Sequence, residues 1–226
     1  MEHQVNQLNN FLGRYAGVTV EIIIQWVIIL IIAAVAIVLT KNLKKIPDKK
    51  QSAVEIFVDA IDNLVISNMG EKSKGFVPYI GTLILFLLFM NLIGLIGIEP
   101  PTKDFNIVLG IALITFLVIQ VYAIKKQGIK GYFIGYAKPI IPLLPINVLE
   151  RIMLPISLSL RLFGNITAAV VIMDLIYNAL GKTPLGIAQL GIPIPFHFYF
   201  DVFDGSIQMI IFVMLTMINI KVTAEH

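Results

Sequence analysis

Three stretches of this chain contain no Asp, Glu, Lys or Arg and are long enough to cross a lipid bilayer. They are residues 22–40, 75–98 and 105–124. A hydrocarbon core of roughly 30 Å needs about 20 apolar residues in an α-helix, and lipid offers the backbone no hydrogen-bond partner outside its own segment. We therefore expect each stretch to be a membrane helix, the first as an anchor and the other two as a transmembrane hairpin.

The composition predicts the same class of protein. Hydrophobic residues make up 58% of the chain and charged residues only 14%, with a mean hydropathy of +0.89, whereas ordinary soluble domains are about 25% charged. These values exclude a soluble globule, a disordered chain, a coiled coil and a nucleic-acid-binding protein. The sequence predicts an all-α integral membrane protein, with residues 1–226 forming a single polytopic domain and the lipid bilayer as its environment.

The lysines between the predicted spans indicate an orientation. Five lie within residues 41–50 and three within residues 125–130, and cytoplasmic connections of membrane proteins carry an excess of Lys and Arg. Both segments should face the cytoplasm, which leaves the N-terminus outside and the C-terminus in the cytoplasm. These lysine-rich connections favour a bacterial plasma membrane over an organelle.

Residues 51–68 are too polar to span a membrane. Their apolar side chains recur near a 3.6-residue period, at Val54, Phe57, Val58, Ile61, Leu64 and Val65. This pattern predicts an amphipathic helix on the cytoplasmic membrane surface. Packing against neighbouring helices of the same chain accounts for the pattern equally well, and both interpretations stay open.

The carboxyl half is also apolar, but charges interrupt it. These are Glu150, Arg151, Arg161, Asp174, Asp201 and Asp204. A charge near the bilayer centre costs about 2.5–3.5 kcal/mol, so it is expected to serve a function or to reach water. Arg151 lies near the predicted cytoplasmic end and can reach the interface with its long side chain. Arg161 has no such exit.

Two long helices are expected here, at 139–180 and 198–221, with a Pro- and Gly-rich outer loop between them. A helix over the ~35 residues from Pro145 to Gly181 is more than about 50 Å long at 1.5 Å per residue, which exceeds the thickness of the bilayer. It must therefore be strongly tilted, with Pro155 as a candidate bend.

Polar side chains form a stripe on each of these helices. At 100° per residue, one stripe contains Glu150, Ser157, Arg161 and Asn165, and the other contains Asp201, Asp204 and Gln208, while Asp174 lies about 140° from Arg161. Facing stripes imply water-accessible cavities. Arg161 stays charged because its pKa is above about 12, whereas desolvated carboxyl groups load and release protons near neutral pH.

The segment SLSLRLFGN at 157–165 closely resembles the signature of the a subunit of the F-type ATP synthase membrane sector. The resemblance extends, in family order, over FLLFMNLIGLIGIEPPTKDFN at 86–106, PINVLERIMLPIS at 145–157 and IQMIIFVMLTMINI at 207–220. The first 70 residues resemble the family only in layout.

The resemblance implies a stator that faces a rotating ring of c subunits and is joined to peripheral-stalk b subunits. Two offset half-channels would carry H⁺ or Na⁺ to and from the ring carboxylates, with Arg161 as the essential charge between them. Such a subunit is not an enzyme in isolation and needs no cofactor, metal or nucleotide. A self-contained secondary transporter and a structural scaffold are the alternatives.

The same resemblance assigns the other polar residues. Asn165 and Gln208 match polar positions, Asp201 stands where relatives carry His or Glu in the outer half-channel, and Glu150 lies near a family carboxylate on the cytoplasmic exit side. Ser157 belongs to the polar stripe of the ion pathway, although Ser157, Asn165 and Gln208 could instead join helices by hydrogen bonds.

Ala169 and Val170 replace a common Gly-Glu pair, so Asp174 or Asp204 is the candidate substitute acid. Which of Asp174, Asp201 and Asp204 is the main relay stays open. His197 and the two terminal histidines are expected to be solvated.

Overall fold

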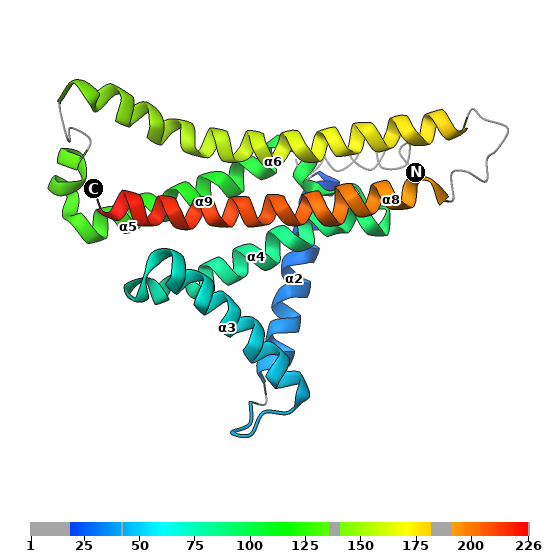
Figure 1. Ribbon diagram of the computed structural model, residues 1–226, viewed down its shortest axis with the longest axis horizontal. Coiled ribbons are helices and arrows are strands. Elements are labelled where there is room, and N and C mark those ends of the chain that lie inside the picture. The colour runs from blue at the N-terminus through cyan, green and yellow to red at the C-terminus, as the bar shows by residue number, and fades with distance from the viewer. Residues whose placement is uncertain (1–18, 42, 136–140, 182–190, 226) are drawn as a thin grey trace.

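A computed structural model describes residues 19–41, 43–135, 141–181 and 191–225, and the regular elements within these ranges are all helical (Figure 1). The long helices are α2 (Val20–Thr40), α3 (Lys49–Met69), α4 (Val77–Leu92), α5 (Phe105–Gly135), α6 (Leu144–Gly181) and α9 (Gly205–Glu225). Short turns extend α4, which begins after a 3₁₀ turn at Glu71–Phe76 and continues into another at Ile93–Ile96. The predicted all-α fold is confirmed.

Five helical segments of the described chain are long and apolar enough to cross a membrane. They are Val20–Thr40, Glu71–Ile96, Phe105–Gly135, Leu144–Gly181 and Pro193–Ala224. The predicted spans at 22–40, 75–98, 105–124, 139–180 and 198–221 each coincide with one of them, except that residues 139 and 140 lie outside the described ranges. Each predicted span therefore overlaps a helical segment, and the differences are at the ends.

Two predicted boundaries were wrong for identifiable reasons. α5 continues beyond 124 because its lysines are compatible with a helix, and it changes direction at Gly128, whose φ of 74° suits only glycine. The last helix begins at Pro193 as α8 (Pro193–His197), earlier than residue 198. Proline in the first helical turn lacks only an N–H that has no intrahelical partner there, so prolines that indicated a loop instead start a helix.

α3 combines the two interpretations of residues 51–68. Its Ile61, Val65 and Met69 are buried against the chain, whereas Ile56 and Phe57 are exposed. One face therefore packs on neighbouring helices, and an apolar part of the other remains available to lipid.

The N-terminus of α3 is capped by a side chain. Asp48 accepts a hydrogen bond of 3.0 Å from the backbone N–H of Gln51, and this bond holds the pKa of Asp48 below its ordinary value. Capping satisfies one of the N–H groups that a helix leaves open at its start.

The two longest helices cannot stand upright in a bilayer. α6 has 38 residues, which is about 57 Å at 1.5 Å per residue, against a hydrocarbon core of roughly 30 Å. Pro155 lies inside α6 without ending it. α8 continues through a π-helical turn at Phe198–Asp204 into α9. In Figure 1, α6 and α9 extend side by side across the view, and α2 runs across their direction.

The core lies where α5 packs against both α6 and α9, with α4 covering another side of α9. Ile80, Leu87, Ile119, Leu162 and Met217 are among its buried members. α6 and α9 contact each other much less than each contacts α5. One long side of α6 is therefore left without a partner from the described chain.

A buried asparagine joins α4 to the start of α9. Asn91 is 1% exposed, donates a 2.9 Å hydrogen bond to the Gly205 carbonyl and accepts one of 3.5 Å from the Thr102 hydroxyl. We expect Asn91→Leu to lower the stability by about 1 kcal/mol, because both partners then lose a buried hydrogen bond. Thermal denaturation of the detergent-solubilised protein measures this, and Asn106→Leu at an exposed position is the control. An equal melting temperature for both variants would contradict it.

Candidate functional site

Arg161 lies near the middle of α6 and is exposed. Within the described ranges its guanidinium makes no hydrogen bond or ion pair. Exposed apolar side chains of α6 lie near it, with Leu160 at 52% and Val171 at 51% exposed. A permanent cation on an apolar, uncovered helix face is costly unless a carboxylate or water from elsewhere reaches it.

The residues nearest Arg161 on this face are small. Ser157, Gly164 and Ala168 are exposed, and a Cβ added at Gly164 would meet no other atom within 4 Å. Small side chains let another helix approach closely in a membrane. We call Ser157, Arg161, Gly164 and Ala168 the arginine face.

The predicted polar stripe of α6 lies largely on this side. Glu150 and Ser157 are exposed like Arg161, and Asn165 is partly buried. Glu150 lies 11 positions before Arg161, roughly 16 Å along the axis at 1.5 Å per residue. The stripe therefore follows one side of α6 toward its first turns.

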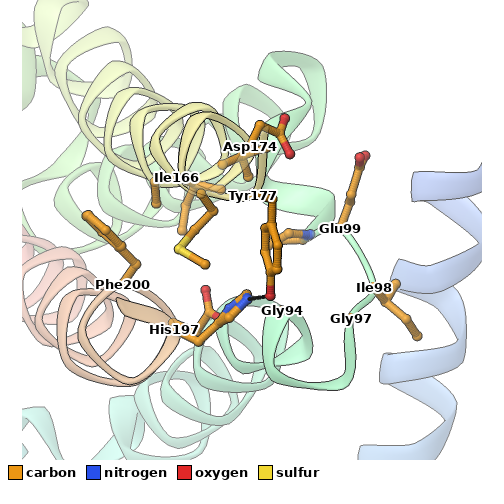
Figure 2. A pocket seen from close by; sticks show the side chains of 14 residues that line it. Gly94, Gly97, Ile98, Glu99, Ile166, Asp174, Tyr177, His197 and Phe200 are labelled. Atoms are coloured by element: carbon orange, nitrogen blue, oxygen red, sulfur yellow. Dashed lines mark hydrogen bonds and ion pairs between the residues drawn. The ribbon is translucent and has the colours of Figure 1, made fainter. Parts of the chain in front are cut away.

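A cavity of about 230 Å³ lies between α6, the segment from α8 to the π-helical turn, and the connection from α4 to α5 (Figure 2). Its lining includes Ile166 and Asp174 of α6, His197 and Asp201 of the α8 segment, and Glu99 of the connection. Asp174 and Ile166 are 13 and 5 positions after Arg161, or roughly 20 and 8 Å along the helix. The cavity thus extends from one end of α6 to within about two turns of the arginine.

Three polar side chains in this cavity are joined by hydrogen bonds. His197 Nδ1 lies 2.7 Å from Asp201 Oδ2, and His197 Nε2 lies 3.0 Å from the Tyr177 hydroxyl. Figure 2 shows Tyr177 extending from α6 to meet His197, while the carboxylates of Asp174 and Glu99 lie on the other side of Tyr177 from His197. We call Tyr177, His197 and Asp201 the cavity triad.

Gly94 makes room for the carboxylate of Asp201. A Cβ built on Gly94 would lie 3.0 Å from Asp201 Oδ1 and 3.1 Å from its Cγ. These separations are tighter than ordinary van der Waals contact, so the missing side chain at position 94 helps to fix where Asp201 sits.

Asp204 and Gln208 form a separate pair. The Gln208 side chain lies beside the Asp204 carboxyl, and Gln208 is 6% exposed. Neither residue lines the cavity that Asp201 lines. The common face predicted for Asp201, Asp204 and Gln208 assumed 100° per residue throughout, and a π-helical turn at Phe198–Asp204 inserts an extra residue that rotates Asp201 relative to Gln208.

The two residues that replace the family's common Gly-Glu pair line the same cavity as Asp201. Ala169 and Val170 line it together with Asp174, whereas Asp204 does not. Of the two candidate substitute acids, Asp174 is the one beside the position where a carboxylate is missing.

Sequence reasoning missed His197, Tyr177 and Gly94. His197 was expected to be solvated, but its side chain is only 30% exposed and bonded on both nitrogens. Its spacing of four residues before Asp201 is the signal that pairs side chains on one helix face. Tyr177 and Gly94 offer no comparable signal, because their contacts are with distant elements.

The other end of the helices is held by a second polar cluster. Arg151 of α6 donates a hydrogen bond to the Thr223 hydroxyl of α9, and Gln127 of α5 donates one of 2.9 Å to the Thr223 carbonyl. Arg151 is therefore not a free interfacial charge, as its position near the helix end had suggested. It helps to fix α5, α6 and α9 relative to one another.

A family model described as ATP synthase A chain matches residues 22–221. This chain is a member of the ATP synthase subunit a family. Similar proteins include "ATP synthase subunit a, sodium ion specific" of Propionigenium modestum, 34% identical over 220 residues that cover 90% of this chain and 73% of that protein. The subunits a of Geotalea daltonii and Geobacter sulfurreducens are each 36% identical, covering 95% and 89% of this chain and 92% and 86% of theirs.

Membership in the subunit a family places the chain in the membrane sector of a bacterial ATP synthase. The subunit therefore works in a complex with other ATP synthase subunits, and it is a membrane component rather than a catalytic one. The five membrane-length helical segments agree with this assignment.

Proposed function

We propose that this subunit a is the stator half of a rotary ion path, with Arg161 as the fixed charge that faces a ring of c subunits. The observation that carries the proposal is the exposed guanidinium on the arginine face, for which the described chain supplies no partner. A carboxylate carried past by a neighbouring ring supplies that partner. The small residues around Arg161 allow the close approach that such pairing needs.

The cavity is the proposed outer half-channel. It reaches from the α4–α5 connection to Ile166 and is lined by Asp174 and Asp201, which take up the ion and pass it toward the ring. Asn165, Asp204 and Gln208 extend this polar route toward the level of Arg161. Asp174 is the favoured substitute for the acid missing at Val170.

Glu150 and Ser157 belong to the proposed cytoplasmic half-channel. They are exposed and lie before Arg161 on the same side of α6, opposite in direction to the cavity. An ion released from the ring on that side leaves along them. Arg161 separates the two routes because it stays protonated and repels a passing cation.

The proposed assembly follows from this arrangement. The ring of c subunits covers the arginine face, peripheral-stalk b subunits hold the stator, and the N-terminus faces out of a bacterial plasma membrane with the C-terminus in the cytoplasm. The translocated ion is H⁺ or Na⁺, and no nucleotide or cofactor binds this chain.

The two alternative functions gain no support from these observations. A self-contained transporter would enclose its essential charge between its own helices, but Arg161 is exposed on an uncovered face. A pure scaffold gives no reason for an unpartnered cation on an apolar surface, since it costs stability there.

Cross-linking tests the docking of the ring on this face. The chain contains no Cys, so single cysteines at Gly164 or Ala168 give this subunit one site for a photoreactive maleimide. We expect both variants to cross-link to the small ring subunit in membranes that contain the whole ATP synthase.

Leu117→Cys is the matched control, because Leu117 is 58% exposed on α5 and away from the arginine face. Cross-linking of Leu117→Cys to the ring, with none from positions 164 and 168, would contradict the proposed orientation.

A further inference from the structure

The cavity triad connects two helices that are distant in sequence. Tyr177 belongs to α6, and His197 and Asp201 belong to the α8 segment. The imidazole lies between a hydroxyl at 3.0 Å and a carboxylate at 2.7 Å, so both ring nitrogens have a partner. The three groups form a continuous hydrogen-bonded chain across the cavity wall.

Exposure changes along the triad. Tyr177 is 39% exposed, the His197 side chain 30% and the Asp201 side chain 13%. The chain therefore leads from the more accessible group to the least accessible one. Glu99 and Asp174, the other ionisable groups lining the cavity, place negative charge around it and favour the presence of cations.

The partners of His197 suit both of its protonation states. In the neutral ring, Nδ1–H donates to the Asp201 carboxylate and Nε2 accepts from the Tyr177 hydroxyl. In the protonated ring, both nitrogens donate, and the tyrosine oxygen accepts instead. Neither state leaves a nitrogen without a partner, so the ring can gain a proton while both nitrogens keep their hydrogen-bond partners.

We propose that Tyr177, His197 and Asp201 form a proton relay that loads the outer half-channel, so that the ion taken up through this cavity is H⁺. This inference rests on the proposed function of the cavity. It adds two relay residues that the family pattern did not assign and decides between H⁺ and Na⁺.

The proton balance of the relay is simple. A hydronium ion in the cavity gives a proton to the tyrosine oxygen and leaves as water, while the tyrosine passes its own proton to His197 Nε2. The imidazolium then releases its Nδ1 proton to Asp201 Oδ2, which becomes a neutral carboxyl group. One proton has entered and one has reached Asp201, which passes it inward and becomes a carboxylate again. The ring now carries its proton on Nε2. It returns to its first tautomer by exchange with cavity water, which accepts the Nε2 proton and supplies one to Nδ1, before the next transfer. Such a positioned acid–base pair typically accelerates proton transfer by about 10²–10⁴.

Sodium fits this arrangement poorly. Hard cations are bound by oxygen ligands, but one oxygen of Asp201 is already engaged by the imidazole nitrogen. A sodium ion at Asp201 would compete with His197 for the carboxylate, whereas a proton uses the existing bond.

Chemical rescue tests the relay. We expect His197→Ala, in the whole ATP synthase reconstituted into liposomes, to slow ATP synthesis driven by a pH gradient by at least about 10-fold. Added imidazole should restore most of the rate by occupying the vacated position. Pyrazole, a ring of the same size that is too weakly basic to carry a proton at neutral pH, should not.

Tyr177→Phe removes only the hydroxyl and should also slow synthesis. Tyr199→Phe is its matched control, since Tyr199 stacks on Phe203 and does not line the cavity. If His197→Ala fails to assemble, this pair decides the question, because equal rates for the two tyrosine variants would overturn the relay.

Three other results would also overturn it. They are a wild-type rate in assembled His197→Ala, equal rescue by pyrazole, or uptake of radioactive ²²Na⁺ by the wild-type complex during ATP hydrolysis. Arg161→Gln separates this inference from the proposed function. Loss of transport in Arg161→Gln with normal transport in His197→Ala refutes the relay alone, whereas normal transport in Arg161→Gln refutes the stator proposal.

Discussion

The Arg161→Gln variant is expected to assemble normally, and its rate of coupled ATP synthesis is expected to fall by at least about 100-fold. Assembly should persist because the guanidinium is exposed and makes no bond within the described chain, so its removal leaves no buried group unpaired. Coupling should fail because glutamine offers no positive charge to ionise a passing carboxylate or to stop ions leaking between the half-channels. ATP synthesis by reconstituted complexes, with passive ion leakage measured in parallel, provides the test.

Lys221→Gln is a suitable control for this variant. It also removes one positive charge from an exposed residue, but on α9, where Lys221 Nζ donates to the Asn68 carbonyl at 3.3 Å. We expect it to retain most of the coupled activity. Normal coupling in Arg161→Gln would instead indicate a structural scaffold and reject a rotary stator.

The Gly94→Val variant is expected to reduce coupled transport by at least about 10-fold without preventing folding. Even a single added carbon would lie 3.0 Å from Asp201 Oδ1, so the larger valine must displace the carboxylate and disturb its contact with His197 Nδ1. A displacement of about 1 Å at a reacting group can cost about 100-fold in rate. ATP-driven ion pumping by vesicles containing the variant complex measures the loss.

Two further variants test this prediction, namely the milder change Gly94→Ala and the control Gly110→Val. Alanine requires Asp201 to shift by only a few tenths of an ångström and should have an intermediate effect. A Cβ at Gly110 of α5 meets nothing within 4 Å, so valine there controls for the loss of a glycine. Equal pumping by Gly94→Val and Gly110→Val would show that the position of Asp201 does not matter.

Much of the architecture could be predicted because the bilayer imposes a simple rule on sequence. Charge-free stretches of about 20 residues must be helices in lipid, and the stretches 22–40, 75–98 and 105–124 each overlap a helical segment of the structure, the second running two residues beyond it. The excess length of α6 likewise predicts that it is inclined in the bilayer. Helix ends were less predictable, since Pro193 and the lysines after 124 are compatible with both a helix and a loop.

The candidate site could be predicted only in part. Arg161 stands out in sequence because a charge in the middle of a long apolar helix is rare and costly, and helical periodicity places Glu150 and Ser157 on its side. The grouping of Asp201 with Asp204 and Gln208 did not account for the π-helical turn, because no local pattern announces an extra residue in a helix.

The sequence by itself determined the membrane class, the helical segments, the family and the residue that we propose as the essential charge. Each follows from local properties, namely hydropathy, periodicity and a contiguous motif. Only the tertiary structure brought Tyr177, His197 and Asp201 into one hydrogen-bonded chain. It also placed Gly94 against the carboxylate of Asp201 and left the arginine face exposed. The physical reason is that these contacts depend on how α4, α6 and the α8 segment pack, and packing between helices is set by many small interactions that no single stretch of sequence contains.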